Sequence, residues 1–212
     1  KDVVLLKADG KGEMVNLTES GYSDTNAKWV LGGKAMIWNS DRSGYRSHGS
    51  WGSESDTYIM FFDVDAYNRF TMSKEDLALL EEAEKTEKEE KAKKEKEEKE
   101  KAEKKKDKKD AKTKDTKKEE DKKKEEVKPL TFDLENRFDR IVRLTVNSSR
   151  LSDAVLTPKG DVLYYLAAFE GDYDLWEHKL KENTTKILLK GVGGGALIPD
   201  KEGKNIFMCT RS

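Results

Sequence analysis

The sequence contains a single cysteine, Cys209, and no apolar run that approaches the length of a membrane span. One cysteine excludes an internal disulfide framework and leaves the compartment open. No signal peptide is visible. The formal net charge of −1 gives no general argument for a nucleic-acid or anionic-surface partner. Disulfide-stapled, membrane-spanning and strongly basic classes of protein are therefore not indicated.

The ends of the sequence indicate a piece of a longer protein. The first residue is Lys1 rather than an initiator methionine, and the last residues stop just past a strand-like run. A piece of this kind need not carry the signal peptide of its parent. We therefore expect further structure on both sides of the 212 residues.

Charge is unevenly distributed along the chain. Charged residues make up 40% of the sequence, whereas about 25% is usual for a globular protein. The excess lies in residues 74–128, where Lys, Glu and Asp dominate in nearly equal numbers of each sign. The foldable material is then about 150 residues in two blocks that flank a charged insert.

A strand–turn–strand pattern repeats along the two blocks. Residues 27–63 read as three short strands with two turns, and the same order recurs at 153–179 and begins again at 196–208. In each case a Gly/Lys turn joins two strands. The distance from Ala154 to Ala196, about 42 residues, fits a four-stranded propeller blade.

We therefore predict an all-β fold of consecutive four-stranded β-propeller blades, a partial propeller, with a long charged α-helical insertion in one blade. The expected strands are 2–7, 13–18, 26–31, 35–39, 56–63, 139–146, 153–156, 162–167, 174–178 and 185–190. The expected units are the end of a preceding blade (1–26), one blade split by the insertion (27–73 and 129–150), the helical arm (74–128), the next blade (151–192) and the start of a further blade (193–212).

The insert has the composition of a solvated helix. Ser73 and Asp76 form an N-cap pattern, and the Ala-, Glu- and Lys-rich residues that follow favour helix with many Glu–Lys pairs four apart. Almost no apolar stripe is present, so we expect no packing face. The lysine runs 104–106 and 122–124 are offset by acids and lack aromatic residues, so no nucleic-acid partner is expected. A spacer, a partner-contact arm and a tolerated insertion stay open; the last is favoured because long surface insertions cost little stability.

The loop after residue 40 holds the most tempting chemistry. Residues 40–44 form a tight turn, in which Asp41 bonds the following amides and Gly44 tolerates a positive φ. His48 and the neighbouring serines supply the residue types of a serine hydrolase, but no nucleophile elbow or oxyanion-hole motif accompanies them. A rim or binding loop is the better interpretation, with Arg42, His48 and Trp51 as the binding candidates. We assign no catalytic residue, and a standalone hydrolase is the weakest alternative.

Metal and cofactor sites are not expected. His178 alternates with Trp176 and Leu180 on a strand, where we expect it partly exposed, and no second His or Cys lies at ligand spacing. The glycine-rich residues 191–195 follow a strand, as a dinucleotide loop does. The next residues, 196–199, read as a strand rather than a helix, so the required context fails.

Residues 38–44 and 56–60, WNSDRSG and DTYIM, resemble the TolB-type propeller blade with its Ser-Asp-Arg-x-Gly turn. Together with the Ser/Gly/Trp loop, the charged arm and residues 132–137, the order resembles the propeller region of bacterial tricorn-like serine peptidases. Residues 167–171 depart from the turn motif. In that family propellers precede a PDZ-like module and a catalytic domain, and neither has a match here.

The resemblance implies a non-catalytic propeller segment that guides or gates peptide substrates toward a catalytic domain outside this chain. It implies as partners a peptide or unfolded protein, the remaining blades, the PDZ-like and catalytic domains, and a homo-oligomer. For a bacterial parent a periplasmic location is favoured, with the cytoplasm as the alternative. The competing interpretation is a TolB-like propeller that binds proteins without proteolysis.

The composition of the insert generates a first prediction. Replacing residues 85–124 with a short Gly/Ser linker should leave the flanking block folded, because the removed residues offer no apolar face for packing. Thermal denaturation followed by circular dichroism at strand wavelengths measures this. A fall in Tm of many degrees would instead show that the arm packs on the rest of the chain.

Overall fold

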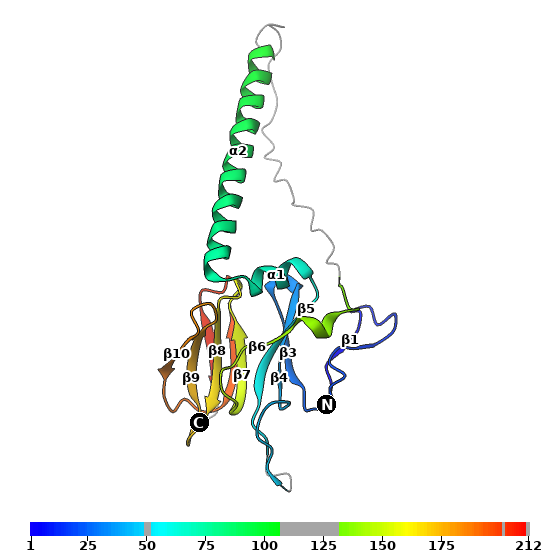
Figure 1. The fold of residues 1–212 in the computed structure, drawn as a ribbon, viewed down its shortest axis with the longest axis vertical. Coiled ribbons are helices and arrows are strands. Elements are labelled where there is room, and N and C mark those ends of the chain that lie inside the picture. Colours follow the sequence, from blue (N-terminus) through cyan, green and yellow to red (C-terminus); the bar gives the residue numbers. More distant parts are fainter. Residues whose placement is uncertain (49–51, 107–131, 201, 211–212) are drawn as a thin grey trace, which may run out of the picture. The chain divides into compact units, whose positions relative to one another are not determined.

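The structure is a computed structural model that describes residues 1–48, 52–106, 132–200 and 202–210, with the side chains of residue 92 and of residues 94–106 not described. The chain divides into two compact units (Figure 1). One consists of Lys1–Thr71 with Leu130–Ser212, and the other is Met72–Pro129.

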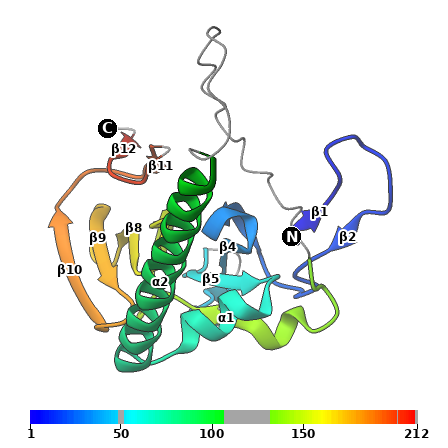
Figure 2. The same cartoon turned by 90° about the horizontal axis from the view of Figure 1, so that it is seen from above.

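Two four-stranded antiparallel sheets form the body of the first unit. The first sheet has the order β3 (Thr25–Val30), β4 (Ala35–Ser40), β5 (Asp56–Phe61) and β6 (Ile141–Arg143). The second has the order β7 (Arg150–Leu156), β8 (Val162–Ala168), β9 (Asp174–Lys179) and β10 (Thr184–Leu189). Each strand pairs with the next strand of the chain, and Figure 2 shows β8, β9 and β10 side by side.

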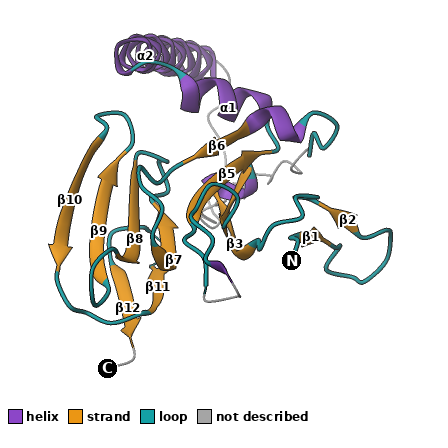
Figure 3. Cartoon of the chain, turned by 60° about the horizontal axis from the view of Figure 1, so that its bottom comes forward, coloured by secondary structure: helices purple, strands orange, loops and turns teal. Residues whose placement is uncertain are grey.

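Two strand pairs flank these sheets. β1 (Val4–Leu5) pairs with β2 (Val15–Asn16), and β11 (Gly195–Pro199) pairs with β12 (Ile206–Thr210) (Figure 3). The first pair is much shorter than the strands expected over 2–7 and 13–18. Leu6 and Met14 are exposed, and no third strand among the described residues joins this pair, so little apolar burial is available to extend it.

The core follows from alternation along β4 and β5, in which all twelve residues are buried. Ile37, Ile59 and Phe61 point to one face and pack in a cluster with residues of β7 and β8 such as Leu156 and Leu163. The alternate residues of these strands point to the opposite face, where they form a second cluster with Leu17 and Phe62: Met36, Trp38, Tyr58 and Met60. Because both faces of the first sheet are covered, apolar residues occupy consecutive positions over 35–38 of β4 and 58–61 of β5. Each fully buried large side chain contributes about 1.5–3 kcal/mol.

A polar contact joins three sheets at their first strands. The Nζ of Lys28 on β3 lies 2.7 Å from both carboxylate oxygens of Asp153 on β7. It also donates to the carbonyl of Ala154 at 3.0 Å. The same carboxylate accepts the Leu197 N–H of β11 at 2.8 Å, and the Asp153 side chain is only 7% exposed. β3, β7 and β11 are therefore tied together by one carboxylate.

Helix α1 (Val64–Thr71) was not anticipated. The strand expected over 56–63 ends at Phe61, and the Asp63 carboxylate accepts the Ala66 N–H at 2.7 Å as an N-cap. The helix then packs Ala66, Tyr67 and Phe70 against the cluster between the two sheets, with the Phe61 and Phe70 ring centroids 5.0 Å apart. The apolar residues of this segment are thus spaced so that one side of a helix, rather than one face of a strand, contacts the core.

The fourth strand of the first sheet is also shorter than expected. Residues 139–146 were predicted as a strand, but a 3-10 helix, η3 (Arg137–Arg140), precedes β6. Both arginines are buried and donate to backbone carbonyls. Arg137 reaches the Leu17 carbonyl at 3.1 Å, and Arg140 reaches the Phe61 carbonyl at 3.1 Å. These charge-assisted hydrogen bonds hold the chain in a turn where alternation alone indicates a strand.

The second unit contains helix α2 (Lys74–Lys106). Ser73 Oγ accepts the Asp76 N–H at 3.1 Å, as the N-cap pattern predicted. Glu87 and Lys91 form an ion pair four residues apart. Residues 107–128 of the expected arm lie outside the described residues. No helix in the described part of the chain is long and apolar enough to cross a membrane.

The contact between the first strands gives a second prediction. Asp153→Ala should lower the free energy of unfolding by about 1–3 kcal/mol, because it leaves the Leu197 N–H without its acceptor and the Lys28 ammonium without its carboxylate partner. The matched control is Lys186→Ala on the outer strand β10, which removes a 3.0 Å ion pair to Glu177 of β9 and should cost roughly 0–1 kcal/mol. Urea denaturation measures both; equal losses would contradict the role given to Asp153.

Candidate binding site around Asp41

The loop between β4 and β5 is itself a narrow ribbon. Ser40 pairs with Asp56 at the end of the sheet, and beyond them Arg46 bridges Ser53. The Glu54 N–H donates to the Tyr45 carbonyl at 2.9 Å. Residues 45 and 46 are therefore paired with residues 53 and 54 rather than lying on an open coil.

Gly44 is required in this loop for a reason other than the one expected. Its φ does not lie in the left-handed region. Instead, a Cβ added at this position would lie 1.9 Å from the carbonyl oxygen of Glu54, on the opposite side of the ribbon. Gly44 therefore allows close approach of two backbone segments, and the expectation of a positive φ was wrong.

The Asp41 carboxylate is the centre of the site. It accepts the Ser23 N–H at 2.8 Å, Arg46 Nη2 at 2.9 Å and Ser53 Oγ at 3.2 Å. Burial by itself would raise the pKa of Asp41, but these three hydrogen bonds and the charge of Arg46 outweigh it and lower the pKa below its ordinary value. Asp41 is thus ionised at neutral pH and connects the loop before β3 to the loop after β4.

A surface hollow of about 570 Å³, the Asp41 hollow, opens between these two loops. Its lining residues are Lys1, Gly21, Tyr22, Ser23, Asp41, Arg46, Ser47, Gly52 and Ser53. The Arg46 guanidinium stands 4.7 Å from the centre of the Tyr22 ring and is half exposed. The hollow offers hydroxyl groups, glycine backbone and one oriented guanidinium, which suits a polar extended ligand held by hydrogen bonds.

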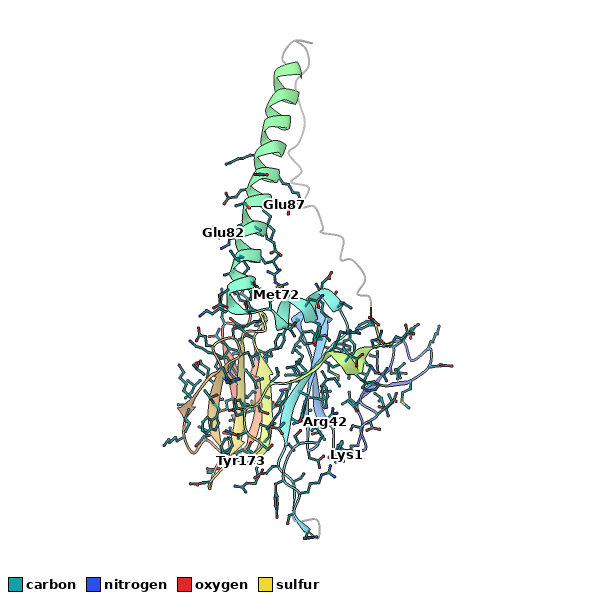
Figure 4. The ribbon with its side chains drawn as sticks, in the orientation of Figure 1. Lys1, Arg42, Met72, Glu82, Glu87 and Tyr173 are labelled. Carbon is teal, nitrogen blue, oxygen red and sulfur yellow. The ribbon has the colours of Figure 1, made fainter. Side chains whose placement is uncertain are left out.

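Arg42 lies beside the Asp41 hollow but faces the protein. Its guanidinium carbon is 5.4 Å from the Trp38 ring and 4.9 Å from the Tyr58 ring. Its Nη2 atom is buried 3.8 Å from the Asp24 carboxylate, without a hydrogen-bond partner in the described part of the chain. Figure 4 labels Arg42 and Lys1 near the same end of the unit, away from α1. These contacts give Arg42 a packing role, and ligand binding by it stays a prediction.

The other predicted site residues are not brought together. His48 is exposed on the ribbon, and Trp51 lies outside the described residues. His178 is on β9, as predicted, but is only 4% exposed, so the expectation of partial exposure was wrong. Burial lowers its pKa, a hydrogen bond to the Thr184 backbone opposes this, and Nδ1 lies 2.8 Å from Thr185 Oγ1. No group of three metal-ligating side chains occurs among the described residues.

Sequence reasoning missed Arg46 and Tyr22 as partners. They are 24 positions apart, and only the fold brings the guanidinium over the ring. Asp56 is a comparable case. Its buried carboxylate accepts Arg143 Nη2 and Thr145 Oγ1, both at 2.7 Å, from residues beyond the insert. The only available signal was an aspartate at the start of a strand, which does not identify its partners.

Comparison with known proteins gives a likeness in structure but none in sequence. No family model matches the chain, and no curated protein matches it in sequence. The chain is similar in structure to the tricorn protease, with a TM-score of 0.55 and 8% sequence identity. The match covers 98% of this chain and 17% of that one. At this identity the likeness concerns the fold alone: antiparallel four-stranded sheets arranged as in part of that protein.

The lowered pKa of Asp41 generates a third prediction. A carboxylate with a depressed folded-state pKa stabilises the protein above its unfolded pKa, and this contribution is lost as pH falls through the folded value. Asp41→Asn should therefore lower the free energy of unfolding by about 1–2 kcal/mol at neutral pH. The difference from wild type should shrink as pH drops below the ordinary pKa of 3.8.

Urea denaturation from neutral to acidic pH measures this dependence. Glu135→Gln removes an exposed carboxylate far from the Asp41 hollow and serves as the control. A stability difference for Asp41→Asn that does not change with pH would show that the charge of Asp41 is not what holds the two loops together.

Proposed function

We propose that this chain is a β-propeller segment of a tricorn-like serine peptidase and guides or gates peptide substrates toward a catalytic domain outside the chain. The observation that carries the proposal is the likeness of nearly the whole chain to the tricorn protease. The chain corresponds to only 17% of that protein, so chemistry carried elsewhere in the parent is compatible with it. A PDZ-like module, a catalytic domain and homo-oligomerisation are parts of the same proposal.

The sheets support consecutive propeller blades. In this reading β3–β6 form the blade of residues 27–73 and 129–150, with a Ser-Asp-Arg-x-Gly turn of the TolB type. β7–β10 form the blade of residues 151–192, β1 and β2 end a preceding blade, and β11 and β12 begin the next. Residues 74–128, with α2, interrupt the first blade between its third and fourth strands. The connection of β3, β7 and β11 through Asp153 is what first strands grouped near a common axis would show.

The substrate-facing part would be the Asp41 hollow and its ribbon. Loops at the ends of strands carry function on a rigid scaffold. Here the ribbon presents His48, and Trp51 belongs to the same loop. The hydroxyl groups and the Arg46 guanidinium can hydrogen-bond the carbonyls of an extended peptide, whatever its sequence. Such contacts would orient a peptide without cleaving it.

A protein-binding scaffold without proteolysis is the second candidate. The observation that favours it is the outer strand β10, all six residues of which are exposed. Ile187, Leu188 and Leu189 form an apolar run on this edge. An edge strand of this kind can add a strand from another protein through backbone hydrogen bonds.

A kinetic experiment on the complete parent protein tests the proposal and gives a fourth prediction. Arg46→Ala should raise KM for long peptides about fivefold, the effect of losing a hydrogen bond near 1 kcal/mol, and leave kcat for a short fluorogenic substrate unchanged. Lys204→Ala, which removes an exposed ion pair to Glu202 in the turn between β11 and β12, is the control. A complete protein with no peptidase activity would overturn the proposal in favour of the scaffold. Equal effects on short and long substrates would refute the guiding role.

A further inference from the structure

A second hollow lies at the opposite end of the first sheet from the Asp41 hollow. Ser40 and Asp56 pair at the loop end, whereas Ala35 and Phe61 pair at the other end, where β5 stops and α1 begins. A hollow of about 340 Å³, the Phe132 hollow, opens at this second end. Its lining residues are Phe62, Asp63, Val64, Asp65, Phe132 and Asp133.

Aromatic rings form one wall of the Phe132 hollow and continue beyond it. The rings of Trp29, Phe62 and Phe132 contact one another, with centroids 5.5–5.7 Å apart. Phe62 is fully buried beneath the other two, but Trp29 is 52% exposed and Phe132 is 40% exposed. The cluster therefore presents ring surface to solvent while its base is anchored in the core.

The remaining lining is acidic. Asp63, Asp65 and Asp133 contribute three carboxylates, and no cationic side chain lines the Phe132 hollow. Two of these carboxylates form ion pairs, Asp63 with Lys34 at 4.0 Å and Asp133 with the buried Arg140 at 3.3 Å. Lys34 and Arg140 lie outside the lining and offset part of this charge, but three carboxylates against two cations still leave a net negative charge.

The walls are fixed by backbone hydrogen bonds. The Asp133 N–H donates to the Phe62 carbonyl at 2.9 Å, which ties the returning chain to the end of β5. Arg140 donates to the carbonyls of Phe61 and Asp133, at 3.1 and 2.8 Å. Asp63 is held by its N-cap bond to Ala66. A ligand therefore meets side chains that are already positioned, which reduces the entropy cost of binding.

We propose that the Phe132 hollow binds a cationic side chain, lysine or arginine, from an extended segment of a partner polypeptide. A cation within about 6 Å of an aromatic face is attracted by the ring, and the aliphatic stem of lysine or arginine can cover the exposed ring surface. The three carboxylates supply charge complementarity. An apolar partner would take these carboxylates out of water without adding a hydrogen bond or a charge to them, and an acidic partner would be repelled. This interaction does not depend on proteolysis by the parent.

Binding measurements on the intact protein test the proposal. The probe is a short fluorescent Gly/Ser peptide with interspersed lysines, compared with its acetyl-lysine and glutamate counterparts by fluorescence anisotropy. Wild type should bind the lysine peptide preferentially, and more tightly at low salt. Trp29→Leu and Asp65→Asn should each weaken binding about three- to tenfold, through lost cation–π attraction and lost charge.

The chain offers matched controls for both variants. Phe169→Leu removes a ring with 43% exposure at the end of β8, and Glu170→Gln removes an exposed carboxylate beside it. Neither should change binding, and thermal denaturation confirms that each variant folds. Equal affinity for the acetyl-lysine peptide, or equal weakening by the control variants, would overturn the proposal. So would a concentration-dependent dimer that Trp29→Leu dissolves while the peptide fails to bind, since a second copy would then be the occupant.

Discussion

The contact that the first unit depends on is the one between Lys28, Asp153 and Leu197. Apolar packing holds sheets together but tolerates sliding, because dispersion and hydrophobic burial have little directionality. A carboxylate that accepts a lysine from one sheet and a backbone N–H from another fixes their relative register. The contact lies on the first strand of each sheet. Since each later strand pairs with the one before it, the contact also sets the positions of the later strands and their loops.

The two ends of the first sheet then acquire different chemistry. At the loop end, buried aspartates (Asp24, Asp41 and Asp56) gather hydroxyl, guanidinium and amide donors from segments distant in sequence. At the α1 end, the buried Arg140 donates to backbone carbonyls, and aspartate side chains line the Phe132 hollow. At both ends a buried charged side chain holds the backbone in place, and polar or aromatic side chains remain at the surface. One end of the sheet therefore has a hollow lined by hydroxyl groups and a guanidinium, and the other has a hollow lined by aromatic rings and carboxylates.

The sequence was sufficient for the regular parts of this fold because alternation and turn residues act locally. The pairing of β4 with β5 and of β7 with β8 could be predicted for that reason. Helix α1 and η3 could not, since each depends on tertiary partners: Phe70 on the inter-sheet cluster, and Arg140 on the Phe61 carbonyl. Only part of the site could be predicted from the sequence. Asp41 could be recognised as a turn residue, but its link to Ser23 and the placing of Arg46 over Tyr22 require the fold.

Residues 40–44, the turn that stands out in the sequence, build local structure rather than a ligand site. Asp41 joins two loops, Arg42 packs on Trp38 and Tyr58, and Gly44 admits the Glu54 carbonyl. Each motif residue is thus engaged in building the turn. The side chains that reach solvent at the Asp41 hollow, Arg46 above all, lie outside the motif. The residues that build this turn are therefore not the ones best placed to contact a ligand, and candidates for ligand contact lie in the rest of the loop.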